Sequence, residues 1–118
     1  MGVMNLSEKQ QTFAHNVGLL ISYICFMGYK VTLGEAFRTQ EQADIYAKEG
    51  KGITHSLHIK RLAIDLNIFD HVGNLLTTVD DLSAFGKYWE KINPDNRWGG
   101  NFKTRPDSDH FEMQDLDK

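Results

Sequence analysis

Two histidines and one aspartate are the residues of this chain best suited to hold a metal ion. His58 and Asp65 lie in one short segment that begins at Ser56, and His110 lies in a second segment that ends at Glu112. Two imidazoles and one carboxylate suit zinc, and three protein ligands leave a fourth position for water. A structural zinc site usually has four protein ligands rich in cysteine, and this chain has 1 cysteine. The residue types therefore favour a catalytic zinc site over a structural one.

A catalytic site of this kind also needs a carboxylate that can shuttle a proton. Zinc promotes amide hydrolysis by lowering the pKa of bound water and by polarising the carbonyl under attack. Asp107, three residues before His110, can supply the proton acceptor. Glu112 lies on the same strand face as His110 and competes for this role, but it can equally orient an imidazole. The residues alone leave these two assignments open.

Length and charge restrict the classes of protein that remain. A chain of 118 residues has the size of one domain, and we expect residues 1–118 to form a single catalytic domain. The net charge of -3 provides no basic field for nucleic acid or anionic lipid. The first residues lack the pattern of a secretory signal, which predicts synthesis in the cytoplasm. Cys25 has no disulfide partner, and its apolar surroundings predict a buried thiol.

Three helices are expected from capping residues that precede stretches of helical periodicity. They cover residues 8–27, 40–49 and 79–92. The capping pairs are Ser7 with Gln10, Thr39 with Gln42, and Thr78 with Asp81. Gly28, Gly50 and Pro94 are the expected stops.

The clearest strand covers residues 62–69, where apolar and other side chains alternate. Leu62, Ile64, Leu66 and Ile68 share one face, and Ala63, Asp65 and Asn67 share the other. This alternation places Asp65 opposite the apolar face, where a ligand facing a cleft must lie. Further strands are expected at residues 29–33, near Leu75, at 97–100 and at 110–113. The prediction is an α+β fold, a small and mainly antiparallel sheet with about three helices packed on it.

The order of these motifs resembles a known family. The pattern Ser56-x-His58-x4-Ala63-x-Asp65, followed by Asp107-x2-His110, is similar to that of the zinc D-alanyl-D-alanine carboxypeptidase and L-alanyl-D-glutamate endopeptidase family. These bacterial and phage enzymes cut peptidoglycan stem peptides and resemble the hedgehog signalling domain in fold. The resemblance extends over residues 31–112, with residues 35–42 in the place of the family's arginine-bearing segment.

The resemblance implies a role for each site residue. His58, Asp65 and His110 would bind zinc, Asp107 would be the general base, Arg38 would hold a substrate carboxylate or carbonyl, and Ser56 would hydrogen-bond the substrate. The planar fork of an arginine suits a carboxylate, and stem peptides carry several. Ser56 can equally be a turn residue. Arg61 stands where the family commonly has glycine, and we expect it to reshape the rim of the site.

The resulting hypothesis is a zinc metallopeptidase that hydrolyses peptide bonds in peptidoglycan stem peptides. The protein resembles a phage or prophage endolysin of the L-alanyl-D-glutamate endopeptidase type, made in the host cytoplasm without a signal peptide and acting on the cell wall, in the periplasm, after release. We expect a monomer that neither binds nucleic acid nor inserts into a membrane. One alternative is a D-alanyl-D-alanine-type carboxypeptidase that trims the stem terminus. Another, from a different class, is a non-catalytic, zinc-stabilised binding module.

The remaining histidines and one tryptophan have structural interpretations. His15 and His71 are expected to be exposed to solvent, and His55 is expected to be a loop residue. Trp98 can form an aromatic wall of the cleft or belong to the core.

Overall fold

Helices and strands alternate along the chain in the computed structural model, which describes residues 4–52 and 56–116. The elements are α1 (Leu6–Phe26), β1 (Lys30–Leu33), α2 (Gln40–Lys48), β2 (Ala63–Phe69), α3 (Val79–Ile92), β3 (Asn96–Trp98), the 3-10 helix η1 (Gly99–Asn101) and β4 (His110–Met113). His55 lies outside the described residues.

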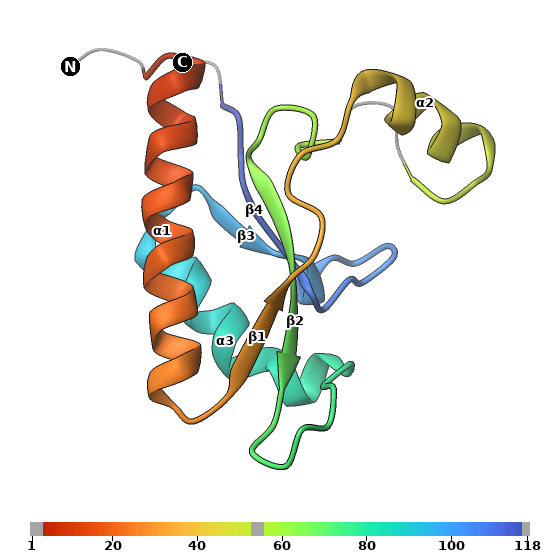
Figure 1. Cartoon of the computed structure of the whole chain (residues 1–118). Coiled ribbons are helices and arrows are strands. Elements are labelled where there is room, and N and C mark those ends of the chain that lie inside the picture. Colours follow the sequence, from red (N-terminus) through yellow and green to blue (C-terminus); the bar gives the residue numbers. More distant parts are fainter. Residues whose placement is uncertain (1–3, 53–55, 117–118) are drawn as a thin grey trace.

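The four strands form one sheet in the order β1-β2-β4-β3, and every neighbouring pair is antiparallel. The long connection through α3 and β3 returns β4 to the side of β2, so segments far apart in sequence become neighbours (Figure 1). In this register Asp65 of β2 lies directly opposite His110 of β4. The sheet therefore brings together two of the predicted metal ligands.

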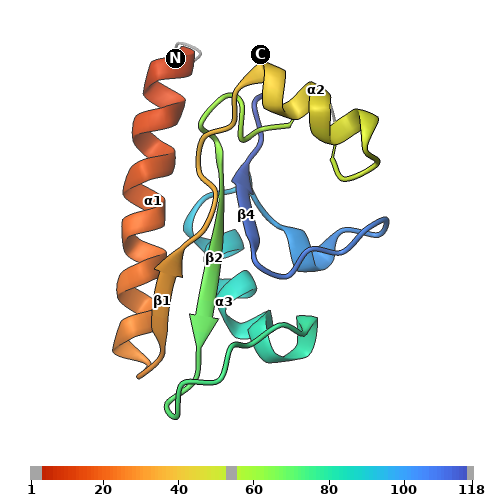
Figure 2. The same ribbon diagram turned by 45° about the vertical axis from the view of Figure 1, so that its right-hand side comes forward.

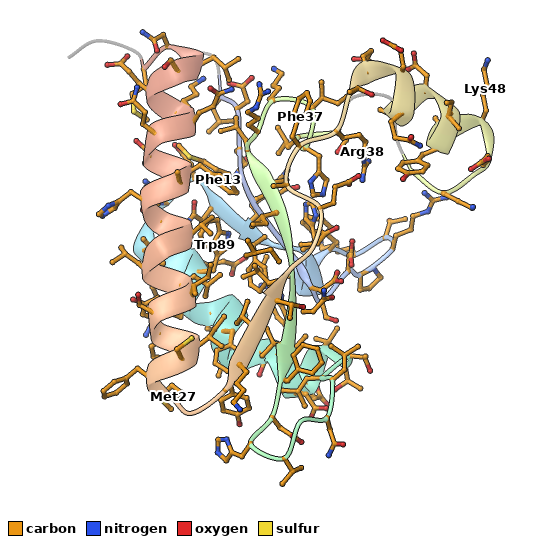
Figure 3. The ribbon with its side chains drawn as sticks, in the orientation of Figure 1. Phe13, Met27, Phe37, Arg38, Lys48 and Trp89 are labelled. Carbon is orange, nitrogen blue, oxygen red and sulfur yellow. The ribbon has the colours of Figure 1, made fainter. Side chains whose placement is uncertain are left out.

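Helices α1 and α3 pack beside one another and cover the sheet with an apolar core (Figure 1). Phe13 of α1 and Trp89 of α3 face each other in this layer (Figure 3), with ring centroids 5.7 Å apart at an angle of 86°. Trp89 also contacts Phe111 of β4, with centroids 6.0 Å apart. The edge-to-face geometry of both pairs suits the quadrupoles of aromatic rings. The central strands thus rest on a rigid aromatic layer.

Helix α2 lies apart from the other two helices, beyond the end of the sheet (Figure 1). In the turned view, α2 and the connection from η1 to β4 project to the same side of β4 (Figure 2). One cleft is lined by residues of the segment before α2, of the η1–β4 connection, and of β2 and β4.

The predicted fold class is confirmed, since the chain has three helices and an antiparallel sheet in the described residues. Helices α2 and α3 begin after the predicted caps, Thr39 and Thr78, whose hydroxyls accept hydrogen bonds from Gln42 N and Asp81 N at 3.1 Å. The predicted strand near Leu75 is reduced to an isolated bridge with Phe69.

Two local predictions about α1 are wrong. The helix is capped by Asn5, whose side chain accepts from Glu8 N while Glu8 accepts from Asn5 N, both at 2.9 Å. Asn5 and Glu8 form a complete capping box that begins two residues earlier than one starting at Ser7. Cys25 is exposed, because the adjacent Ile24 points into the core and successive helical residues diverge by about 100°.

Trp98 belongs to the core, where it is 2% exposed and its indole nitrogen donates to Ser108 O at 2.8 Å. Gly86 of α3 leaves the space that its ring fills, since a Cβ built there would overlap the indole. We expect Gly86→Ala to destabilise the protein by about 1–3 kcal/mol through overpacking. Urea denaturation of this variant provides the measurement.

Gly18→Ala is the matched control for this prediction. Gly18 is an exposed residue of α1, and no atom lies within 4 Å of a Cβ built on it. This variant should be more stable by about 0.5–1 kcal/mol, because alanine loses less backbone entropy in a helix. Equal effects of the two substitutions would contradict the packing described for Trp98.

No helix among the described residues is both long enough and apolar enough to cross a lipid bilayer.

Candidate active site

A tight turn before β2 presents the first of the clustered residues, His58. Backbone N–H groups of Ile59 and Leu62 donate to Ser56 O at 3.1 Å and Leu57 O at 3.0 Å. The imidazole of His58 is buried, with only 3% of the residue exposed. Its position is therefore fixed by the turn and by its surroundings.

Arg61 completes this turn in the left-handed region, with φ of 58°. This conformation explains why a glycine suits the position, since glycine adopts positive φ without steric cost. An arginine tolerates it at a cost of about 1–2 kcal/mol. Its guanidinium lies over the ring of Phe37, 4.0 Å from the centroid, which offsets part of that cost. Arg61 thus keeps the turn and adds a contact at its rim.

Ligand atoms of His58, Asp65 and His110 all lie within 4.8 Å of one another. Oδ1 of Asp65 is 3.5 Å from Nε2 of His58 and 3.1 Å from Nδ1 of His110. Zinc binds such atoms at about 2.0–2.2 Å, so two tetrahedral ligands are about 3.3–3.6 Å apart. The spacing of this cluster therefore fits a zinc ion with little rearrangement.

The second nitrogen of each imidazole faces a hydrogen-bond acceptor. Nδ1 of His58 lies 3.2 Å from Ala36 O, and Nε2 of His110 lies 2.7 Å from Oε1 of Glu112. If each of these nitrogens carries the proton and donates it, the lone pairs of His58 Nε2 and His110 Nδ1 point toward Asp65. Histidines that ligate metals are commonly fixed in this way by a carbonyl or a carboxylate. In this arrangement His58 Nε2, His110 Nδ1 and the Asp65 carboxylate can all bind one cation.

Electrostatics hold Asp65 charged and favour a proton on His110. Burial raises the pKa of Asp65, but hydrogen bonds and charges from His110 and His58 outweigh it and lower the pKa to about 2. Burial lowers the pKa of His110, but hydrogen bonds to Asp65 and Glu112 and their charges raise the pKa to about 9. In the metal-free protein a proton on His110 therefore supplies positive charge at this cluster.

Glu112 contacts Nε2 of His110, whereas Asp65 lies at the other ring nitrogen, Nδ1. Glu112 is 6% exposed, and its Oε2 accepts from Nε of Arg97 at 2.8 Å and from a second guanidinium nitrogen. Burial raises the pKa of Glu112, but hydrogen bonds and charges from His110 and Arg97 keep it below its ordinary value. Of the two roles left open by the sequence, this geometry favours an orienting partner of the imidazole.

Asp107 lies at the mouth of the site on the η1–β4 connection. Its backbone N–H donates to Gly99 O at 2.9 Å, and its carbonyl accepts from His110 N at 3.2 Å. The side chain is exposed and close to Asp65 and Asp109, with carboxylate oxygens within 4.8 Å of one another. Burial, a hydrogen bond with Asp107 and the charges of Asp107 and Asp65 raise the pKa of Asp109 to about 7. An exposed carboxylate beside the cluster can exchange protons with a water in the cleft.

A cleft of about 370 Å³ opens over these residues. Its lining includes His58, Asp65, His110, Asp107, Glu112, Ser56, Arg38 and Arg105. Ser56 also accepts a hydrogen bond from His58 N at 3.2 Å, so it is a turn residue that faces the cleft.

Arg38 reaches the cleft from the segment that joins β1 to α2 (Figure 3). Its guanidinium pairs with Glu35 and lies 5.0 Å from the ring centroid of Tyr46. Its Nε is buried and has no hydrogen-bond partner among the described residues. Glu35 and Tyr46 therefore hold the Arg38 side chain in place, while its Nε–H has no hydrogen-bond acceptor among the described residues.

The structure gathers every site residue predicted from the sequence around one cleft. The cleft also contains Arg97, Phe102 and Arg105, which the sequence analysis did not select, and Asp109 lies beside Asp65 and Asp107. Arg97 is paired with Glu112 across β3 and β4. The sequence does predict the two strands that carry Arg97 and Glu112. It does not give the register in which they pair, so it could not predict this contact.

The comparisons with known proteins identify a family and agree with this fold. The family model described as D-alanyl-D-alanine carboxypeptidase matches residues 49–113, more than half of the 118-residue chain, so the chain belongs to this family of peptidases. The matched segment contains His58, Asp65, Asp107 and His110.

Among solved structures, the chain is similar to the Serratia marcescens L-Ala D-Glu endopeptidase ChiX, with a TM-score of 0.73 and 17% sequence identity. The alignment covers 88% of this chain and 79% of that chain. At this level of identity the likeness concerns the fold. No curated protein sequence gives a significant match.

Proposed function

We propose that the protein is a zinc-dependent peptidase that hydrolyses peptide bonds in peptidoglycan stem peptides, with activity of the L-alanyl-D-glutamate endopeptidase type. The observation that carries this proposal is the cluster of His58, Asp65 and His110, whose ligand atoms are spaced as zinc requires. The family supports peptide hydrolysis, and the similar fold of an L-Ala D-Glu endopeptidase supports the substrate.

Zinc held by these three residues would supply Lewis acidity to the scissile carbonyl and would acidify water. Asp107 takes the proton of the attacking water and passes it to the leaving amine, a role that its exposed carboxylate suits. Glu112 accepts the hydrogen bond from Nε2 of His110, so that Nδ1 is the nitrogen turned toward Asp65 and the ion. Arg38 binds a carboxylate or carbonyl of the substrate, and Ser56 offers it a hydroxyl.

A D-alanyl-D-alanine-type carboxypeptidase is the second candidate, and the description of the family model favours it. An exopeptidase must bind the free carboxylate at the end of its substrate, and Arg38 lines the cleft. Its pairing with Glu35 neutralises part of that charge, which weakens an anchoring role and favours the endopeptidase. The two candidates release different fragments from the same stem peptide.

Digestion of purified sacculi, followed by mass spectrometry of the new termini, tests the proposal. We expect new amino termini at glutamate and new carboxyl termini at alanine, and their loss after treatment with a chelator. Zinc added back should restore them. Release of single D-alanine residues would instead establish the carboxypeptidase, and cleavage that survives complete zinc removal would contradict the metal site.

Binding of zinc should release a proton from His110. The pKa of this imidazole is about 9 in the metal-free protein, whereas a ligating imidazole must give up the proton on Nδ1. We expect about one proton per zinc ion from His110 at pH 7.5, and apparent affinity that rises with pH up to about 9. Isothermal titration calorimetry in buffers of different ionisation enthalpy measures this number.

The control for proton release is Glu112→Gln, which removes a charge that raises the pKa of His110. This variant should release fewer protons per zinc ion at the same pH. An equal number in both proteins would show that Glu112 does not set the protonation of His110.

The narrower predictions of a phage or prophage endolysin, of release from the host cytoplasm to the wall, and of a monomer remain proposals. Lysis of outer-membrane-permeabilised cells tests the first. The alternative of a non-catalytic binding module predicts that zinc-loaded protein binds sacculi without producing any new termini.

A further inference from the structure

Cationic side chains surround the cleft, and one of them has no ion-pair partner among the described residues. The lining includes Arg38, Lys51, Arg97 and Arg105. Glu35 pairs with Arg38, Glu112 pairs with Arg97, and Glu49 lies 3.5 Å from Lys51. Arg105 makes no ion pair or hydrogen bond with the described part of the chain. It therefore brings an uncompensated positive charge to a site where the other cations already have carboxylate partners.

The connection that carries Arg105 is anchored on both sides. Phe102 N and Asp107 N both donate to Gly99 O, at 3.1 and 2.9 Å. Beyond Asp107, Ser108 accepts from the indole of Trp98 and donates its hydroxyl to Thr77 O, each at 2.8 Å. These contacts hold the base of the loop against the core, so the position of Arg105 relative to the cleft is set by the fold.

Arg105 also has an unusual backbone. Its φ of 54° lies in the left-handed region, and Arg61 is the other non-glycine residue with positive φ in the described segments. Non-glycine residues in this region cost about 1 kcal/mol or more, and such strain is concentrated at functional sites. The backbone bends over residues 103–105, and Pro106 follows and fixes its own φ.

Resting on the function proposed above, we infer that Arg105 is a specificity residue that binds a free carboxylate of the substrate residue next to the scissile bond. Arg105 and Asp107 lie two positions apart on one anchored loop, and both line the cleft. A carboxylate held by Arg105 therefore lies near the proton acceptor and the bond that is cut. In a stem peptide, a glutamate linked through its side chain has such a carboxylate, and amidation removes its charge.

The test uses zinc-loaded protein and two synthetic peptides that differ in one group. Both contain L-alanine joined to side-chain-linked D-glutamate and lysine; one has the free α-carboxylate of glutamate and the other its carboxamide. We expect the wild type to prefer the carboxylate by roughly 10- to 100-fold in kcat/KM, the range of one charge-assisted contact. Arg105→Gln should lose the preference by slowing cleavage of the carboxylate peptide alone, and Arg105→Lys should keep part of it.

Lys103→Gln is the matched control, since Lys103 is an exposed cation of the same loop that does not line the cleft. This variant should keep the wild-type preference. A preference retained by Arg105→Gln, or lost equally in Lys103→Gln, would overturn the inference and leave the proposed function standing. Failure of the zinc-loaded wild type to cleave either peptide would contradict the proposed function itself. Circular dichroism of each variant identifies any loss of folding.

Discussion

Replacement of Asp65 by alanine should abolish zinc binding and reduce kcat/KM on peptidoglycan fragments by about 10³-fold or more. Asp65 lies between the two histidines, 3.5 Å from Nε2 of His58 and 3.1 Å from Nδ1 of His110. Without Asp65 the ion has two protein ligands, and the negative charge that both histidines contact is gone. Charge stabilisation by a catalytic metal amounts to several kcal/mol, and about 4 kcal/mol corresponds to this factor in rate. Zinc content by mass spectrometry and steady-state kinetics measure the two effects.

Asn67→Ala is the matched control for Asp65→Ala. Asn67 lies two residues further along the same face of β2 and is also half-buried, but it does not line the cleft. Its side chain donates to Thr32 at 3.2 Å on the neighbouring strand. This variant should bind one zinc ion and keep nearly full activity. Normal zinc content in Asp65→Ala would show that the carboxylate is not a ligand.

Asp107→Asn should separate chemistry from metal binding. Asp107 is exposed at the mouth of the cleft and is not among the three clustered ligands, so the variant should fold and bind zinc normally. Loss of the proton acceptor should lower kcat by about 10²- to 10⁴-fold. Zinc affinity, measured by competition with a chromogenic chelator, and kcat at saturating zinc provide the test.

Glu112→Gln should weaken zinc binding and leave kcat at saturating zinc nearly unchanged, the reverse of Asp107→Asn. The pair of variants therefore decides which carboxylate is the general base. Because Glu112 fixes the imidazole of His110 from behind, its replacement should weaken zinc binding by about 10- to 100-fold. Saturating zinc should then restore most of the activity. If Glu112→Gln lost kcat at saturating zinc while Asp107→Asn kept it, Glu112 would be the general base.

The sequence predicted those parts of the site that depend on short-range patterns. Alternation in β2 placed Asp65 opposite the apolar face, and burial along the strand agrees with that pattern. The caps of α2 and α3 were readable because each hydroxyl needs only a backbone N–H three residues away. In α1 two capping signatures overlap, and the stronger reciprocal pair of Asn5 and Glu8 lies earlier.

Long-range register set the features that the sequence could not predict. The pairing of Asp65 with His110 and of Arg97 with Glu112 depends on how β4 lies between β2 and β3. A shift of one residue would turn every side chain of β4 to the other face. The choice between Asp107 and Glu112 depends on this register, because it directs Glu112 toward Arg97 and the back of His110.

Arg61 shows a second limit of sequence patterns. Arg61 stands where the family commonly has glycine and was expected to reshape the rim of the site, and the structure gives it a positive φ of 58°. The arginine tolerates this region because the turn is held by hydrogen bonds and its side chain lies over Phe37. Residue type alone did not predict this left-handed backbone, whereas the contact with Phe37 places Arg61 where a change at the rim was expected.

The most direct test of this account is an anomalous diffraction map from crystals of the zinc-loaded protein. The account predicts one zinc peak, about 2.0–2.2 Å from Nε2 of His58, a carboxylate oxygen of Asp65 and Nδ1 of His110, with Asp107 outside the coordination sphere. Neighbouring carboxylates of Asp65, Asp107 and Asp109 offer the competing position. A peak among those three carboxylates, or no peak at the histidines, would contradict the proposed active site.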